Sequence, residues 1–153
     1  LDGVGLPLAA GLYSVNQCLK QHGIRGKLKL NSSGKLIGPG RQIMAFALGA
    51  NAIYSARGFM LSLGCIQALQ CGNNTCPVGI TTHDPSLQKG LVIKSRAPRI
   101  ANYVHNIEHD LEELLRASGC RNFNELTEDN LYIPANTVLG EYASHLLPSA
   151  TAA

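Results

Sequence analysis

The sequence predicts an α/β fold, and specifically the C-terminal part of a larger one. Three observations lead to this prediction. Helix-like and strand-like patterns alternate along the first half of the chain, which is typical of parallel strands joined by crossover helices. The pattern predicts only two strands, and two strands do not make a parallel sheet that can bury both of its faces. The chain also begins with Leu rather than Met, so we expect it to be a piece of something longer.

The first elements are indicated by apolar spacing and by glycine and proline. Pro7 suits a first helical turn and Gly23 suits a helix stop, and apolar residues recur between them at helical spacing (Leu8, Leu12, Val15, Leu19). Residues 27–31 alternate between Lys and Leu and then reach Asn, which predicts a short strand. After a Ser-Ser-Gly turn and a Gly-Pro-Gly turn, residues 41–48 predict a short helix that Gly49 closes.

The next elements are more apolar. Residues 50–56, centred on Ile53 and Tyr54, predict a buried strand. Residues 59–70 are apolar nearly all round, as in a buried helix. A loop rich in Pro, Gly and Thr then spans residues 72–90.

The last part of the chain is helical in pattern. An amphipathic helix follows Pro98 and ends at Gly119, because its apolar positions step by four and three residues (Ile100, Val104, Ile107, Leu111, Leu114). Asn122 with Glu125 forms a capping box that opens a last short helix. The tail from Pro134 is weakly patterned, so we expect it to be loosely held.

The composition excludes several classes of protein. The chain has 153 residues, of which 45% are hydrophobic and 15% are charged, so it is not a disordered chain. A net charge of +3 does not describe a nucleic-acid binder. The longest stretch without Asp, Glu, Lys or Arg, residues 58–83, holds too many polar side chains to span a membrane. No secretion signal opens the sequence, so we expect a cytoplasmic protein whose cysteines are thiols or metal ligands.

The strongest chemical pattern is a group of three cysteines, Cys65, Cys71 and Cys76, with Pro77 directly after the last. Thiolates are the usual ligands of iron–sulfur clusters, and runs closed by Cys-Pro occur among such sites. The Gly-Asn-Asn turn at 72–74 can direct backbone N–H groups at cluster sulfurs. Three local ligands suit a [3Fe–4S] cluster better than a four-iron cluster, because the remaining cysteines, Cys18 and Cys120, are distant in the sequence.

Two other interpretations of the three cysteines stay open. Zinc could be held by the three thiolates and His83, although His83 has a looser spacing than common zinc modules show. The cysteines could also be unrelated buried thiols, because Cys is often simply a core residue. Their clustering beside a Gly-Asn-Asn turn and a proline favours the iron–sulfur cluster.

A second pattern follows the two predicted strands. Ser33, Gly34 and Lys35 come after the first strand, and Ala56 and Arg57 come at the end of the second. Ligands of parallel α/β folds gather at the C-terminal ends of strands, where backbone N–H groups and basic side chains can hold a phosphate. Glycines after strands commonly make turns and nothing more, so this pattern alone does not establish a phosphate site.

Residues 64–80 resemble the cluster loop of the glutamate synthase family. Three segments upstream resemble the last part of that family's flavin-binding barrel. They are Gly5-Leu6-Pro7-Leu8, the turn at 33–36, and the sequence Ala47-Leu48-Gly49-Ala50. The resemblance covers residues 3–126. It implies the C-terminal portion of a (β/α)8 TIM barrel with a cluster-binding loop and a helical C-terminal appendage. We expect four parts: the last βα units of the barrel (1–64), an iron–sulfur loop (65–90), a helical appendage (91–130) and a loosely held tail (131–153).

The resemblance also implies site residues. Cys65, Cys71 and Cys76 match the family's cluster ligands. The other matches depart from the family: Ser33, Gly34 and Lys35 stand where such barrels carry Asp-Gly-Gly, and Ala56 and Arg57 stand in the place of a Gly-Arg or Gly-Thr pair. Losing the Asp puts side-chain contacts to FMN in doubt, whereas backbone N–H contacts remain possible. His83 stands where relatives often have Gln.

By the same resemblance, the expected function is oxidoreductase activity that reduces 2-iminoglutarate, formed from 2-oxoglutarate and ammonia, to glutamate. The implied cofactors are FMN and a [3Fe–4S] cluster. The implied partners are an electron donor (ferredoxin or a reductase subunit) and the rest of the barrel. The alternatives are an N-methylglutamate synthase-like subunit and a non-catalytic fragment that binds a metal or a partner. No catalytic residue can be assigned, because the earlier barrel strands are not in this sequence.

Overall fold

The computed structural model describes residues 4–141, and its helices and strands alternate in the predicted order. The elements are α1 (Leu8–Gln21), β1 (Asn31–Ser33), α2 (Pro39–Ala47), β2 (Ala52–Tyr54), α3 (Ala56–Ser62), α4 (Pro85–Gln88) and α5 (Ile93–Ala117). Two short 3-10 turns lie between them (η1 Arg25–Lys27, η2 Cys71–Asn73), and two more follow α5 within the described residues (η3 Phe123–Glu125, η4 Glu128–Asn130). The prediction of a mixed α/β chain with few strands is confirmed.

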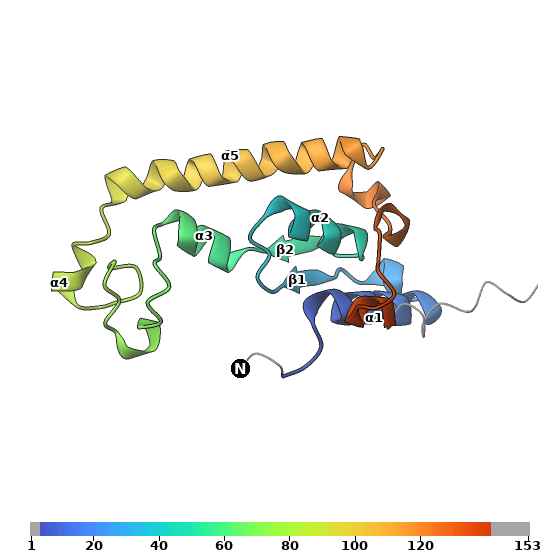
Figure 1. The fold of residues 1–153 in the computed structure, drawn as a ribbon, viewed down its shortest axis with the longest axis horizontal. Coiled ribbons are helices and arrows are strands. Elements are labelled where there is room, and N and C mark those ends of the chain that lie inside the picture. The colour runs from blue at the N-terminus through green and yellow to red at the C-terminus, as the bar shows by residue number, and fades with distance from the viewer. Residues whose placement is uncertain (1–3, 142–153) are drawn as a thin grey trace, which may run out of the picture.

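The two strands pair in parallel, with Asn31 opposite Ala52 and Ser33 opposite Tyr54. Helix α2 makes the crossover between them, so β1, α2 and β2 form one βαβ unit. Within residues 4–141 this sheet has no third strand, which is compatible with part of a larger domain. Both strands end toward the side of the molecule that carries the loop between α3 and α5 (Figure 1).

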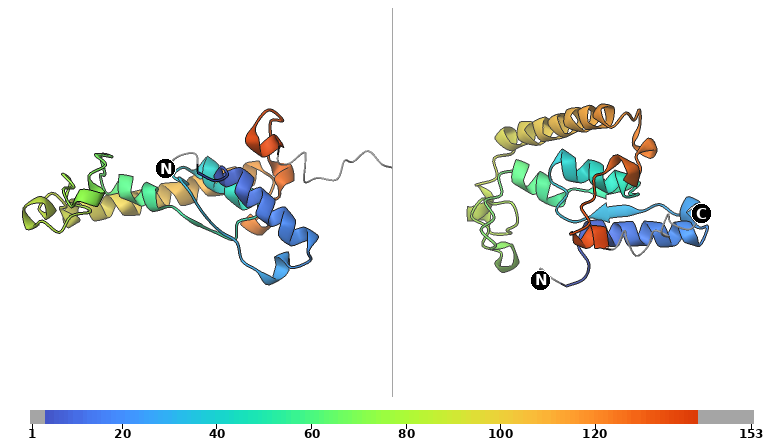
Figure 2. Two further views of the ribbon diagram at one scale, coloured as in Figure 1. Left: turned by 90° about the horizontal axis from the view of Figure 1, so that it is seen from below. Right: turned by 45° about the vertical axis from the view of Figure 1, so that its right-hand side comes forward.

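Helix α2 has apolar contacts on both of its sides. One cluster of buried side chains joins α1 and α2 with the segments that follow β1 and α2 (Leu12, Tyr13, Leu36, Ala45, Leu48, Ala50). A second cluster joins α2 to α5 and to the segment that follows it (Ile43, Ala47, Leu111, Leu115, Leu126). The long helix α5 therefore runs over α2 and α3, with the strands and α1 beyond them (Figures 1 and 2). This packing fixes α3, from which the three-cysteine segment starts.

The strand expected at residues 27–31 is wrong in position. Arg25–Lys27 forms a 3-10 turn, and the strand covers Asn31–Ser33. The reason lies in Arg25, whose guanidinium donates to the backbone oxygens of Leu28 at 3.0 Å and of Gly49 at 2.7 Å. These bonds hold the alternating Lys-Leu segment outside the sheet, and Leu28 is 47% exposed.

The helix expected at residues 59–70 is also wrong. Helix α3 starts earlier and ends at Ser62. Gly64 takes a left-handed conformation with φ +97°, its N–H bonds to the oxygen of Leu61, and the N–H of Cys65 bonds to the oxygen of Met60. This is a Schellman-type helix end, which favours glycine. Consequently Cys65 begins a loop instead of lying in a helix.

The last helix begins before Pro98 instead of after it. Helix α5 starts at Ile93 and continues through Pro98, whose missing N–H removes the one backbone bond to the oxygen of Lys94. Two smaller differences accompany this. The loop at 72–90 contains α4, capped by Asp84, and the helix expected after Asn122 is a 3-10 turn in which the Asn122 side chain accepts from the N–H of Asn124.

The expected tail, 131–153, is described only as far as Glu141, and residues 142–153 lie outside the described part. No helix in the described part of the chain is both long and apolar enough to cross a membrane.

Candidate metal and flavin site

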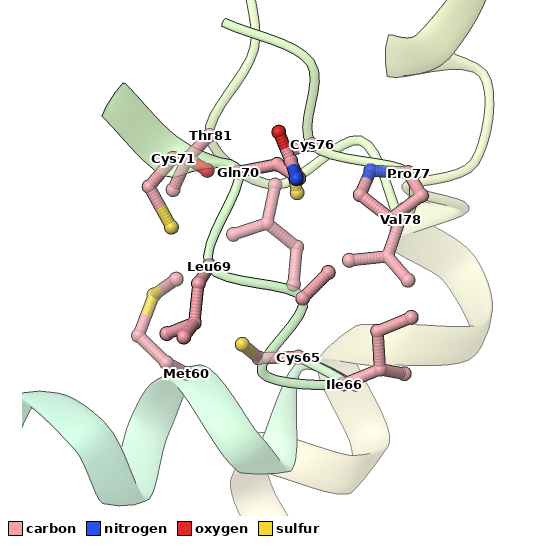
Figure 3. Close-up of a pocket in the computed structure, with 12 residues that line it drawn as sticks. Met60, Cys65, Ile66, Leu69, Gln70, Cys71, Cys76, Pro77, Val78 and Thr81 are labelled. Atoms are coloured by element: carbon pink, nitrogen blue, oxygen red, sulfur yellow. The ribbon is translucent and has the colours of Figure 1, made fainter. Parts of the chain in front are cut away.

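The three clustered cysteines face one apolar hollow, whereas Cys18 and Cys120 lie elsewhere. Cys65, Cys71 and Cys76 line this hollow together with apolar side chains of the same segment (Met60, Ile66, Leu69, Val78, Ile80). Figure 3 shows the three sulfur atoms directed toward it. All five cysteines are free. The exposed Cys18 lies on α1, and Cys120 follows α5 and packs near Leu111 and Leu115.

Backbone N–H groups are directed at two of the sulfurs. The N–H of Gln67 donates to Sγ of Cys65 at 3.4 Å. The pKa of Cys76 is lowered to about 7, chiefly because the N–H and the hydroxyl of Thr81 favour the thiolate. Burial raises this pKa, and the N–H groups of Val78 and Ile80 contribute less than burial does, but all the donors together outweigh it. Such donors are typical of the surroundings of metal-bound thiolates.

Thr81 is the residue of this hollow that the sequence did not reveal. Its hydroxyl is buried and has no hydrogen-bond partner of good geometry among the described residues. It lines the hollow beside Cys76, so its free hydrogen-bonding capacity faces the sulfur. The Cys76 sulfur is the acceptor nearest to hand for this hydroxyl, which fits a residue that supports a metal-bound thiolate. The donor set and its surroundings therefore fit an iron–sulfur cluster.

The spread of the sulfurs bears on the zinc alternative. Sulfurs bound to one tetrahedral zinc at about 2.3 Å would lie about 3.8 Å apart. Among the described residues, the sulfurs of Cys65, Cys71 and Cys76 do not all lie within 4.8 Å of one another. His83 is exposed and does not line the hollow. The arrangement suits a cluster, in which each thiolate binds a different iron, better than a single ion.

The segment that carries Cys71 and Cys76 is held by local hydrogen bonds. Asn74 has a left-handed conformation with φ 62°. Its backbone oxygen accepts from the hydroxyl of Thr82 at 2.6 Å, and its side-chain oxygen accepts from the N–H of His83 at 2.6 Å. The side chain of Gln88 donates to the oxygen of Thr82 at 3.0 Å, which ties α4 to the same segment. The cysteines are thus placed by a folded loop.

The residues expected at the flavin phosphate come together as well. Since Ser33 lies opposite Tyr54 in the parallel pair, the turn at 33–35 and the residues that follow β2 are at the same edge of the sheet. Gly34 and Lys35 both have positive φ, +155° and 54°, so the chain turns sharply directly after β1. Ala56 and Arg57 are exposed in the first turn of α3.

A groove connects this edge with the cysteines. Ala56, Arg57, Cys65 and Cys71 line one open groove of about 310 Å³, with Met60 and Leu69 between them. The hollow between the three sulfurs is much tighter, with about 10 Å³ of free space. The two spaces share Cys65 and Cys71, so a group held by the sulfurs would border the groove that Arg57 lines.

A βαβ unit whose strand edge opens onto a thiol-lined groove defines this chain as a segment of an α/β protein with a candidate ligand site at that edge. Comparison with known protein families identifies the family: the family model described as "Conserved region in glutamate synthase" matches residues 1–121 of this chain. The chain therefore belongs to the glutamate synthase family, a family of oxidoreductases.

Curated relatives agree with the family. The chain is 47% identical over 118 residues to a glutamate synthase large subunit-like protein, YerD, of Bacillus subtilis (strain 168), covering 77% of this chain and 22% of that protein. It is 34% identical over 125 residues to an archaeal glutamate synthase [NADPH] of Methanocaldococcus jannaschii, covering 82% and 24%. It is 34% identical over 146 residues to an archaeal-type glutamate synthase [NADPH] of Thermotoga maritima, covering 95% and 29%. The chain thus spans about a quarter of the length of these relatives.

Proposed function

We propose that this chain is the cluster-bearing end of a glutamate synthase-like oxidoreductase. In this proposal Cys65, Cys71 and Cys76 hold a [3Fe–4S] cluster, and the backbone around Ser33–Lys35 and Ala56–Arg57 holds the phosphate of FMN. Residues 1–64 are the last βα units of a (β/α)8 barrel, followed by an iron–sulfur loop (65–90), a helical appendage (91–130) and a tail (131–153). Its proposed location is the cytoplasm.

The observation that carries the proposal is the convergence of three thiols on one apolar hollow. Single-ion sites bring their ligands closer together than these sulfurs lie. The N–H of Gln67 donates to Sγ of Cys65, and the Thr81 donors favour the thiolate of Cys76 over its thiol. The chain's own contribution is therefore to direct hydrogen-bond donors at two of the sulfurs and to line their hollow with the half-buried Val78 and Ile80.

The proposed phosphate contacts rest on position and charge. The turn after β1 and the first turn of α3 present backbone N–H groups at one sheet edge, and the exposed Arg57 adds a positive charge there. The same groove reaches Cys65 and Cys71, so a flavin held by its phosphate at this edge would lie near the sulfurs. Side chains for 2-oxoglutarate belong to the rest of the barrel in this proposal.

When bound, the cluster supplies one-electron transfer and the flavin supplies the hydride that reduces 2-iminoglutarate to glutamate. The proposed partners are 2-oxoglutarate, an ammonia source, an electron donor (ferredoxin or a reductase subunit) and the remaining strands of the barrel, in the same chain or in a companion chain.

The test uses the full-length protein purified without oxygen. We expect stoichiometric flavin, about three irons with acid-labile sulfide, and a low-temperature EPR signal after mild oxidation. Glutamate formation from 2-oxoglutarate should then be assayed with ammonia and with methylamine. A preference for methylamine would indicate an N-methylglutamate synthase, and stoichiometric zinc without sulfide would contradict the cluster.

A further inference from the structure

Two hydroxyl groups join the loop after β1 to α3 and α5. The hydroxyl of Ser55, the residue that precedes α3, donates to the backbone oxygen of Leu36 at 2.5 Å. The hydroxyl of Tyr103, on α5, donates to the backbone oxygen of Ile37 at 2.9 Å. The two hydroxyl oxygens lie 3.1 Å apart. We call Ser55 and Tyr103 the hydroxyl pair, and it holds two successive carbonyl groups directly after the turn at 33–35.

The two carbonyl groups belong to the end of that turn. The N–H of Ile37 bonds to the oxygen of Lys35 at 3.0 Å, which closes the turn. The buried side chain of Gln42 donates to the oxygen of Leu36 at 3.1 Å, so this peptide group is also held from α2. The turn is therefore tied at its end to α2, to the start of α3 and to α5.

Ser55 serves this turn instead of its own helix. Serine at the position before a helix commonly accepts hydrogen bonds from the first N–H groups of that helix. Within the described residues, the Ser55 side chain makes no such capping bond to α3. Its hydroxyl donates across the sheet edge to the oxygen of Leu36.

The Tyr103 hydroxyl reaches the turn through a space that a glycine leaves open. A Cβ atom added at the buried Gly58 would overlap this hydroxyl and would lie 2.7 Å from the hydroxyl oxygen of Ser55. The ring of Tyr103 packs edge-on against the ring of Phe59, with centroids 5.4 Å apart. Both contacts are with the first turn of α3, so α5 holds α3 and the turn after β1 with one side chain.

The hydroxyl pair lies between the two segments that we assign to the flavin phosphate. Ser55 directly precedes Ala56 and Arg57, and the carbonyl groups that it and Tyr103 bind directly follow the turn at 33–35. A trans peptide group is planar, and its oxygen and N–H point in opposite directions. Fixing these oxygens therefore also fixes where the neighbouring N–H groups point. Donors held in place before binding lose less freedom when an anion arrives.

We propose that Ser55 and Tyr103 are positioning residues for the phosphate of FMN. They act through the backbone, because they hold the turn at 33–35 at a fixed separation from the backbone at 56–57. The two segments can then direct their donors at one phosphate. This inference rests on the proposed function, because that function gives the turn a phosphate to bind. It adds a role for α5, which contributes to the flavin site through Tyr103.

The test compares two flavins on the full-length protein from which bound flavin has been removed. FMN has the phosphate, and riboflavin lacks it. The variants are Tyr103→Phe, which keeps the ring that packs on Phe59, and Ser55→Ala. Quenching of flavin fluorescence gives both affinities, and the phosphorus NMR resonance of bound FMN reports the surroundings of the phosphate. Amide exchange of residues 34–38 measures the mobility of the turn without any flavin.

Two matched controls make the same chemical changes elsewhere. Tyr132→Phe removes a hydroxyl from a residue that is 92% exposed. Ser62→Ala removes a hydroxyl from the end of α3 that bonds to the oxygen of Phe59 within the same helix. Neither hydroxyl bonds to the turn after β1 in the described part of the chain.

We expect Tyr103→Phe and Ser55→Ala each to weaken FMN binding about fivefold, which is the effect of losing one neutral hydrogen bond. Riboflavin affinity should stay unchanged, the phosphorus resonance of bound FMN should shift, and amide exchange at 34–38 should become about fivefold faster. The double variant should lose less than the product of the two single effects, because the two hydroxyls are in contact and act on one turn. The controls should match the unmodified protein.

Three results would overturn the positioning proposal. The first is an equal loss of affinity for FMN and riboflavin, because that would assign the hydroxyl pair to the stability of the fold. The second is an FMN affinity that stays unchanged in both pair variants, and the third is an equal loss in the controls. Absence of flavin binding by the unmodified protein would instead contradict the proposed function. Amide exchange would even then show whether Tyr103 holds the turn, so the two failures are distinguishable.

Discussion

The backbone N–H of His83 donates a 2.6 Å hydrogen bond to the side-chain oxygen of Asn74. This bond closes the segment that contains Cys76, and the 2.6 Å bond from the Thr82 hydroxyl to the backbone oxygen of Asn74 strengthens the closure. His83 therefore acts through its backbone, while its exposed side chain does not line the hollow between the cysteines. Asn74 places Cys76, although it is not itself a ligand candidate.

Asn74→Ala should loosen the loop around Cys76. The substitution removes the acceptor for His83 and places Ala at φ 62°, which favours Asn or Gly. We expect a cost of about 1–2 kcal/mol, seen as about fivefold to thirtyfold faster amide exchange over residues 74–83 and as slower reconstitution with iron and sulfide. Asn73→Ala is the matched control, because the hydrogen bond that the Asn73 side chain makes within the described residues is an exposed one of 3.3 Å to the side chain of Gln70. Equal effects of the two substitutions would contradict the role of Asn74.

Replacing any one of Cys65, Cys71 and Cys76 by Ser should remove most of the iron. Each of the three lines the same hollow, so losing one removes a cluster ligand. Cys18→Ser and Cys120→Ser are the controls, because Cys18 is exposed on α1 and Cys120 lies beyond α5. Iron, sulfide and EPR intensity of the full-length variants give the measurement. Iron retained in Cys71→Ser would show that the exposed Cys71 is not a ligand.

Arg57→Ala should weaken the retention of FMN without removing iron. Arg57 lines the groove near the ends of both strands but is not one of the residues around the sulfurs. A charged hydrogen bond to phosphate contributes about 1.5–3 kcal/mol, so we expect at least tenfold weaker flavin binding in gel-filtered full-length protein. Arg121→Ala should leave flavin binding unchanged. The same flavin affinity in both variants would move the phosphate away from Arg57.

The sequence predicted the order of elements and the three cysteines for physical reasons that can be named. The alternation of apolar patterns was enough to predict the order of β1, α2 and β2, but not the position of β1, because a βαβ unit depends mainly on local periodicity. The apolar pattern did not predict the end of α3, because Gly64 stops the helix before the apolar run ends. It failed at 27–31 because Arg25 binds oxygens as distant as that of Gly49. The glycine at 64 could have predicted the helix stop.

The remaining features of the site depend on contacts that no local pattern contains. Three contacts show this: the Thr81 donors at Cys76, the bond from His83 to Asn74, and the approach of Arg96 to Gly64. Only the folded loop brings the two residues of each contact together. The cysteine spacing predicts which residues could be ligands. It does not predict which N–H groups reach the sulfurs or what borders them.

Residues 1–153 expressed alone should aggregate or fold only partly. A two-stranded sheet is marginal by itself, and both outer edges of β1 and β2 are unpaired within the described part of the chain. Tyr54 is 61% exposed beside one of these edges. Light scattering and thermal unfolding of the isolated chain give the measurement, with the full-length protein as the control. A cooperative unfolding transition of a monomer would show that the segment needs no further strands.

Gly79→Ala should disrupt the cysteine loop, whereas Gly72→Ala should not. Gly79 has φ +77°, and a Cβ there would lie 2.5 Å from the backbone oxygen of Leu87 and 3.0 Å from the backbone nitrogen of Leu91. The positive φ alone costs about 1–2 kcal/mol for Ala, and the backbone contacts leave the new methyl group no space. The loop would have to move away from α4, and Cys76 would move with it.

Gly72 is a close control because it lies in the same loop, directly after Cys71, and a Cβ there would meet nothing within 4 Å. We therefore expect Gly72→Ala to change stability by less than about 0.5 kcal/mol and to leave iron binding intact. Gly79→Ala should lower the iron content of the full-length protein while its flavin content stays unchanged, because the strand ends at 33–35 and 56–57 are not part of this contact. Iron loss in both variants would mean that the loop tolerates no side chain at either glycine. Iron loss in neither would mean that the packing of 78–79 against 87–91 does not position Cys76.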